Sequence, residues 1–140
     1  MNEIESLIPH RPPFLFVNQI ISADKDTIVG LKTFDDSFEG FEGYFPDKKL
    51  VPGVILVESM AQCGGAGVRE AGFAREGLFV LAVIENARFL GIVNFGDTVK
   101  MTIKNHRITD KAIKQSGICE VDGKIVIEAK WLSMNTLNAG

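Results

Sequence analysis

A single apolar stretch after Pro52 places the strongest constraint on how this chain can fold. It reads GVILVESMAQCGGAGVREAG from residue 53 to residue 72, and its apolar residues fall on every side of a helix instead of on one stripe. A helix that is apolar nearly all round has to be buried nearly all round. The stretch therefore predicts a central helix enclosed by other elements, as when a sheet wraps around it.

The same stretch contains glycines at positions 64, 65, 67 and 72. Each of them lowers the intrinsic helix propensity by roughly 1 kcal/mol relative to alanine in a helix interior. A helix tolerates this cost where another backbone packs closely against it. We therefore expect a neighbouring element to approach the glycine side of this helix.

Segments rich in β-branched and aromatic residues flank the helix and predict strands. They occupy residues 14–22 and 27–34 before the helix, and residues 78–84, 98–108, 112–121 and 124–132 after it. Apolar and polar residues alternate with period two in 98–108, which is typical of a half-exposed strand. Asp122-Gly123 is the preferred residue pair for a tight hairpin turn between the last two strands.

Two strands before the helix and about four after it predict an α+β fold, in which an antiparallel sheet of about six strands wraps around one long central helix. A length of 140 residues with 46% hydrophobic content suits a single domain, residues 1–140. Residues 35–46 predict a long irregular loop, of the kind that often carries function. The polar residues 135–140 are expected to form a frayed tail.

Composition argues against several classes of partner and site. The net charge of −3 lacks the basic excess of a nucleic-acid-binding protein. No apolar run reaches the 18 or more residues of a membrane span, and the N-terminus does not read as a signal peptide. Cys63 and Cys119 stand apart from any second ligand at metal-binding spacing. We expect a reduced, cytoplasmic protein without metal or cofactor.

Five stretches resemble one family, the FabZ-type 3-hydroxyacyl-acyl-carrier-protein dehydratases. They are IPHRPPFLFVNQI at residues 8–20, EGYFPDKKLVPGVILVESMAQ at 42–62, ENARF at 85–89, FGD at 95–97 and VDGKIVIEA at 121–129. The stretches follow the family's order over nearly the whole chain. The central one is the most specific, because its proline, glycine, glutamate and MAQ fall at fixed spacing.

The resemblance implies a hot-dog fold and a homodimer with two active sites at the subunit interface, assembled in some members as a trimer of dimers. It implies an acyl carrier protein as partner, and removal of water from a (3R)-hydroxyacyl thioester to give the trans-2-enoyl product in fatty-acid or related acyl-chain biosynthesis. The family's catalytic pair is a histidine in a Gly-His-Phe-Pro motif of one subunit and a helix glutamate of the other. Here the glutamate is Glu58.

Tyr44 stands where the family has its histidine, in the sequence Gly43-Tyr44-Phe45-Pro46. It precedes Glu58 by 14 positions, which is the family's spacing, so the replacement falls on the catalytic position. An imidazole with a pKa of about 6.5 accepts a proton at neutral pH, whereas a phenol with a pKa of about 10 stays protonated. A tyrosine in this place is therefore expected to donate a hydrogen bond rather than to act as a base.

The replacement leaves three functions open. In the first case the chain is a dehydratase, in which Glu58 serves as the base and Tyr44 polarises the substrate, or in which a second subunit supplies a histidine. In the second case it is a catalytically impaired relative that binds acyl thioesters or partners an active subunit. In the third case it is a thioesterase, in which Glu58 activates water.

Further site residues follow from the resemblance and from position on the helix. The backbone N–H of Gly53 is expected to bind the thioester carbonyl, unless the glycine serves only the turn after Pro52. Gln62 lies one turn after Glu58 on the same face, where it either orients Glu58 or contacts substrate. Phe45 and Pro52 complete the expected substrate-binding set.

The remaining candidates have mainly structural interpretations. His10 belongs to the family's N-terminal HR-x-PF segment, and His106 lies late in a strand beside Arg107; both are interpreted as structural. Several phenylalanines could line an acyl-chain tunnel, among them Phe38, Phe41, Phe79 and Phe89. A basic rim for an acidic carrier protein could be formed by Lys48, Lys49, Arg69, Arg75 and Arg88.

Overall fold

The computed structural model describes residues 3–35, 44–45, 47–74 and 76–136. Its elements are η1 (Ile4–Ser6), β1 (Gln19–Ala23), β2 (Thr27–Thr33), α1 (Gly53–Glu70), β3 (Phe79–Phe89), β4 (Thr98–Ile108), β5 (Ala112–Val121) and β6 (Lys124–Asn135). The six strands form one antiparallel sheet in the order β1-β2-β4-β5-β6-β3. The predicted α+β fold with six strands and one long helix is confirmed.

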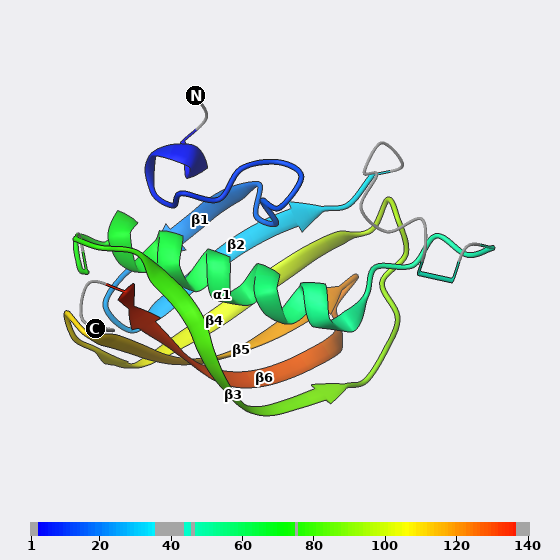
Figure 1. The fold of residues 1–140 in the computed structure, drawn as a ribbon. Coiled ribbons are helices and arrows are strands. Elements are labelled where there is room, and N and C mark those ends of the chain that lie inside the picture. The colour runs from blue at the N-terminus through cyan, green and yellow to red at the C-terminus, as the bar shows by residue number, and fades with distance from the viewer. Residues whose placement is uncertain (1–2, 36–43, 46, 75, 137–140) are drawn as a thin grey trace.

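The sheet curls around α1, which lies along its concave face (Figure 1). Met60, Cys63 and Ala66 of the helix are fully buried, and so is Trp131 of β6. Cys63 and Cys119 are both free and buried, and burial raises the pKa of both thiols. The enclosed helix predicted from its all-round apolar surface is therefore present.

Two glycines of α1 allow the sheet to approach the helix closely. A Cβ added at Gly64 would overlap the side-chain amide of Gln115, and one at Gly67 would overlap Ile28. Gln115 then donates from Nε2 to the Gly64 carbonyl at 3.2 Å and accepts from Trp131 Nε1 at 3.1 Å. The predicted close approach is thus made by side chains of the sheet rather than by its backbone.

Both ends of α1 have a local cause. Pro52 precedes the helix in an extended conformation, and its carbonyl accepts the N–H groups of Ile55 and Leu56. At the other end Gly72 has a φ of 95°, and Phe73 N–H donates to the Val68 carbonyl at 2.9 Å. A left-handed glycine followed by this bond is a Schellman motif, which ends a helix by satisfying its last carbonyls.

Three strand boundaries differ from the prediction by more than one residue. β1 begins at Gln19 instead of residue 14, because the backbone before it bonds to the side chain of Gln62: Phe16 N–H donates to Oε1 at 2.8 Å, and Nε2 donates to the Phe14 carbonyl at 3.2 Å. β3 and β6 run longer than predicted, because they pair with each other along their length.

The predicted frayed tail is wrong at its first residue. Asn135 belongs to β6 and is only 3% exposed. Its Nδ2 donates to the carbonyls of Glu76 and Asp110 at 3.0 and 2.9 Å. A polar side chain is buried here because it satisfies the backbone of two loops. Residues 137–140 and most of the predicted loop at 35–46 lie outside the described residues.

Candidate active site

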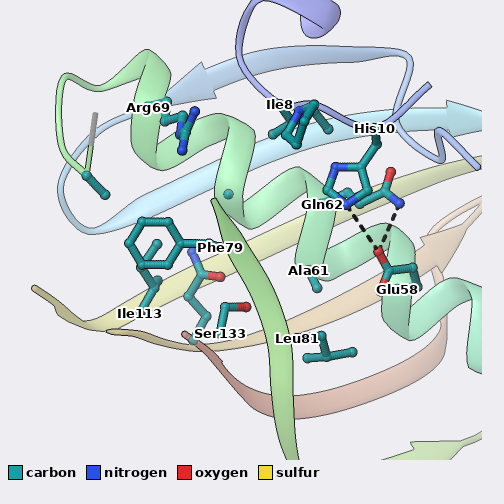
Figure 2. Close-up of a pocket in the computed structure, with 14 residues that line it drawn as sticks. Ile8, His10, Glu58, Ala61, Gln62, Arg69, Phe79, Leu81, Ile113 and Ser133 are labelled. Carbon is teal, nitrogen blue, oxygen red and sulfur yellow. Dashed lines mark hydrogen bonds and ion pairs between the residues drawn. The ribbon is translucent and has the colours of Figure 1, made fainter. Parts of the chain in front are cut away.

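A pocket with a cavity volume of about 30 Å³ runs along one face of α1 (Figure 2). The helix contributes Glu58, Ala61, Gln62, Gly65 and Arg69 to its wall. Their spacing of three or four residues places them on a single helix face.

The other walls come from segments distant in sequence. They are Ile8, Pro9 and His10 of the N-terminal segment, Ala74 after the helix, Phe79 and Leu81 of β3, Ile113 and Gln115 of β5, and Ser133 of β6. A Cβ added at Gly65 would meet no atom within 4 Å, so the floor of the pocket is open along the helix. The apolar part of the lining lies beside Glu58 and is made by Ile8, Phe79, Leu81 and Ile113.

Gln62 connects Glu58 to the N-terminal segment. Its Nε2 donates to Glu58 Oε2 at 2.9 Å, while the same amide holds the backbone of Phe14 and Phe16. The side chains of Glu58 and Gln62 therefore meet, as expected from their spacing. Within the described residues, every hydrogen bond and ion pair of Glu58 involves Oε2, and Oε1 is left for a ligand.

His10, which is interpreted from the sequence as structural, lies beside Glu58. Its Nε2 lies 3.9 Å from Glu58 Oε2, and the ring lines the pocket (Figure 2). Its Nδ1 is buried without a hydrogen-bond partner among the described residues. Burial lowers the pKa of His10, against the opposing effect of Glu58. No local pattern links His10 to the helix; only its being one of two histidines could have drawn attention to it.

Arg69 does not belong to an exposed basic rim. It lines the pocket, and its guanidinium donates to the carbonyls of Leu7 and Gly77. It therefore ties the end of α1 to two loops. Arg88 pairs with Glu128 at 3.6 Å on the surface. Lys48 and Lys49 are exposed, and Arg75 lies outside the described residues.

The other predicted site residues lie away from this pocket. Tyr44 and Phe45 are 39% and 58% exposed, and their rings pack edge to face with centroids 4.8 Å apart. Neither they nor Pro52 and Gly53 line the pocket that contains Glu58. One chain by itself thus does not bring Tyr44 to the carboxylate. Among the predicted tunnel phenylalanines Phe79 lines the pocket, Phe89 is 54% exposed outside it, and positions 38 and 41 are not described.

Gly53 has both a structural and a potential binding role. A Cβ at Gly53 would lie 2.5 Å from two ring carbons of Phe89, so the glycine makes room for that ring. As the first residue of α1, Gly53 has no intrahelical acceptor for its N–H. No described residue accepts a hydrogen bond from it, and it remains a donor for an anionic or carbonyl oxygen.

Replacing Gln62 with leucine is expected to lower the free energy of unfolding by about 1–3 kcal/mol, because it leaves the buried Phe16 N–H without its acceptor. Urea unfolding measures this. Ser59→Ala is the matched control on the same helix, since the buried Ser59 hydroxyl has no partner among the described residues. Equal stability of the two variants would show that Phe16 N–H finds another acceptor.

Two negative findings concern the described residues alone. No three or more of their His, Cys, Asp and Glu side chains are grouped to hold a metal ion. Neither described helix combines the length and hydropathy that crossing a bilayer requires.

Comparison with known proteins places this chain in one family. The family model of the FabA-like domain matches residues 8–130. A protein of Solibacter usitatus named 3-hydroxyacyl-acyl-carrier-protein dehydratase FabZ is 43% identical over 131 residues, which cover 93% of this chain and 81% of that protein. A protein of the same name from Bacillus cereus is 37% identical, with coverage of 93% and 91%.

Solved structures show the same fold at low identity. The dehydratase heterocomplex ApeI:P from Xenorhabdus doucetiae superposes with a TM-score of 0.79 at 16% identity, covering 99% of this chain and 94% of that one. The uncharacterized protein PH1136 from Pyrococcus horikoshii superposes with a TM-score of 0.68 at 18% identity, with coverage of 96% and 95%. These likenesses concern the fold alone, which is the hot-dog fold implied by the sequence.

Proposed function

The chain belongs to the FabA-like family, and from that premise we propose that it is a FabZ-type dehydratase, which removes water from a 3-hydroxyacyl chain carried by acyl carrier protein. Relatives named FabZ that are 37–43% identical over most of the chain support the reaction class. The observation that carries the site is Glu58, whose Oε2 is held by Gln62 while Oε1 is left for substrate. The apolar groove along α1 then takes the acyl chain.

Glu58 carries the proton transfers in this proposal. Its carboxylate takes the proton from the carbon alpha to the thioester, and the electron pair of the broken C–H bond forms the new double bond. The C–O bond at the beta carbon breaks, and Glu58 returns the proton to the departing hydroxide, which leaves as water. Atoms and charge balance with no further acid. In a homodimer the partner subunit's Gly53 would donate its N–H to the thioester carbonyl and stabilise negative charge there, with Pro52 and Phe45 of the partner subunit flanking the substrate.

Tyr44 reaches this site from a second copy of the chain. In a homodimer the partner subunit's Tyr44 would donate a hydrogen bond to the substrate hydroxyl or carbonyl, in the place of the family's histidine. The exposed position of Tyr44 and its separation from the pocket of its own chain support such sharing.

The edge strand β3 supports a dimer. Among the described residues β3 pairs only with β6, and no described strand pairs with its other edge. Val80, Val83 and Ile84 are 43%, 46% and 50% exposed on it. A long apolar edge strand in this state invites pairing with another strand. We therefore place the dimer contact at β3, with further association into a trimer of dimers possible through other surfaces.

Ile84→Asp is expected to shift the protein from dimer to monomer in sedimentation velocity and to abolish turnover with it, since an unpaired carboxylate is costly to bury in a contact. Ile125→Asp is the matched control, because Ile125 is also apolar and 42% exposed but lies in β6, which has a neighbouring strand on each side. A dimer that survives Ile84→Asp would place the contact elsewhere.

A second candidate function rests on Tyr44 itself. Because the chain lacks the motif histidine, it could bind acyl thioesters without turnover, or partner a subunit that carries the histidine. The structurally similar ApeI:P is titled a dehydratase heterocomplex, which supports the idea that this fold works with unlike partners.

The test is a mass-spectrometric assay of the purified protein with 3-hydroxyacyl- and trans-2-enoyl-acyl-carrier-protein. Interconversion of the two species in both directions is expected. Release of free carrier-protein thiol would identify a thioesterase instead. Binding of acyl carrier protein without conversion would favour the second candidate, and turnover that appears only on adding a histidine-bearing relative would identify a heterocomplex.

A further inference from the structure

We propose that His10 is a positioning residue for Glu58: it remains a neutral imidazole and directs an Nε2–H toward Oε2, so that Oε1 points at the substrate. The catalytic meaning of this inference rests on the proposed function, whereas the contact between His10 and Glu58 does not depend on that function.

The geometry places two side-chain nitrogen atoms near one carboxylate oxygen. Gln62 Nε2 donates to Glu58 Oε2 at 2.9 Å, and His10 Nε2 lies 3.9 Å from the same atom (Figure 2). A separation of 3.9 Å is longer than a hydrogen bond. Hydrogen bonds in catalytic sites are often long before substrate binds and shorten in the complex. We expect the His10–Glu58 separation to shorten in this way when the pocket is filled.

The surroundings of His10 favour the neutral ring with its proton on Nε2. Nδ1 is buried and has no partner among the described residues, so a proton there would leave a buried N–H unsatisfied. The charged groups around the ring are Glu58 on α1, the adjacent Arg11, and Arg69 on the far wall of the pocket. Burial is the largest effect and lowers the pKa of His10. The charge of Glu58 raises this pKa, and the charge of Arg11 lowers it.

A neutral donor has a specific consequence for the carboxylate. It stabilises the ionised form of Glu58 by a hydrogen bond without supplying a competing acid. It also selects the orientation in which Oε1 faces the substrate. His10 is therefore not a substitute for the missing motif histidine: its Nδ1 is buried and its Nε2 faces Glu58, so neither nitrogen is placed to take the substrate proton.

The activity test compares two replacements of His10. In His10→Gln the amide Nε2 is a neutral donor near the position of the imidazole Nε2. In His10→Leu the side chain keeps a similar volume but has no donor. We expect His10→Leu to lower kcat by about 10- to 100-fold, the loss of one hydrogen bond to a charged group. KM is expected to change little, and the acidic limb of the kcat/KM profile should move to higher pH. His10→Gln should restore both.

Equal losses in His10→Gln and His10→Leu would overturn the proposal and make His10 an acid or base. A loss in His10→Leu without a shifted acidic limb would also overturn it and make the role structural. His106→Gln is the matched control for losing a histidine, because His106 is exposed, bonds to Ser116 and does not line this pocket.

A second readout does not depend on turnover. The chain has two histidines, so ¹⁵N NMR of the His106→Gln variant reports on His10 alone. We expect a neutral Nε2–H tautomer at pH 7 and a titration midpoint below 6.5, which falls further in Glu58→Gln because a neighbouring negative charge is removed. A midpoint unchanged by Glu58→Gln would sink the proposal. If this coupling is found while the protein shows no dehydration, the proposed function fails and the positioning contact stands.

Discussion

Replacing Glu58 with glutamine is expected to lower kcat/KM for dehydration by about 10²- to 10⁴-fold, the usual contribution of a positioned acid–base group. Glutamine keeps the size of the side chain and an oxygen for the Gln62 donor. It cannot take a proton from the carbon alpha to the thioester. The loss should therefore appear at saturating substrate, while the urea midpoint of unfolding stays near that of the unmodified chain.

The control for this variant is Glu70→Gln, the same chemical change on the same helix. Glu70 is exposed at the end of α1 and does not line the pocket. It should leave the rate unchanged. Full activity in Glu58→Gln would contradict the proposed site, and a reduced unfolding midpoint in that variant would assign the loss to folding instead.

Replacing Tyr44 with histidine is expected to raise the rate of dehydration, by up to about 10²- to 10⁴-fold if a missing base is what limits the reaction. An imidazole is a far better proton acceptor than a phenol at neutral pH. The gain should be largest above pH 6.5, where imidazole is neutral. Steady-state rates between pH 5 and 9 measure this gain. Tyr44 is exposed, so we expect the protein to accommodate histidine at this position without repacking.

Tyr44→Phe is the matched variant that removes only the hydroxyl. A loss of about 10-fold is expected if the phenol donates a hydrogen bond to substrate. Combining Tyr44→His with Glu58→Gln should remove most of the gain, since both groups would act on one substrate. No gain in Tyr44→His, together with a loss in Tyr44→Phe, would show that the tyrosine is the working residue and the site is complete without histidine.

Much of the fold could be predicted because it depends on short-range patterns. Apolar residues on every side of α1 required an enclosing sheet, and the alternation in β4 and the Asp122-Gly123 turn marked strand and hairpin. Prediction was least accurate where a side chain, and not a neighbouring strand, bonds to the backbone. Gln62 bonds to the backbone of residues 14–16 in place of a neighbouring strand. Asn135, predicted to begin a frayed tail, bonds to the carbonyls of two loops.

The candidate site divides in the same way. The spacing of Glu58 and Gln62 on one helix face determined their contact, and the motif determined that Tyr44 replaces a histidine. These relations need only helical geometry and sequence order. By itself the sequence therefore determined the enclosed helix, the strands and the carboxylate of the site.

The tertiary structure alone decided which distant groups surround that carboxylate. His10 lies 3.9 Å from Glu58, and Gln62 bonds to the backbone of the segment that follows His10. Arg69 lines the pocket and donates to two loop carbonyls. No periodic pattern in the sequence predicts either contact. Buried polar groups choose their partners by proximity in the folded chain, and that proximity exists only after the sheet has closed around the helix.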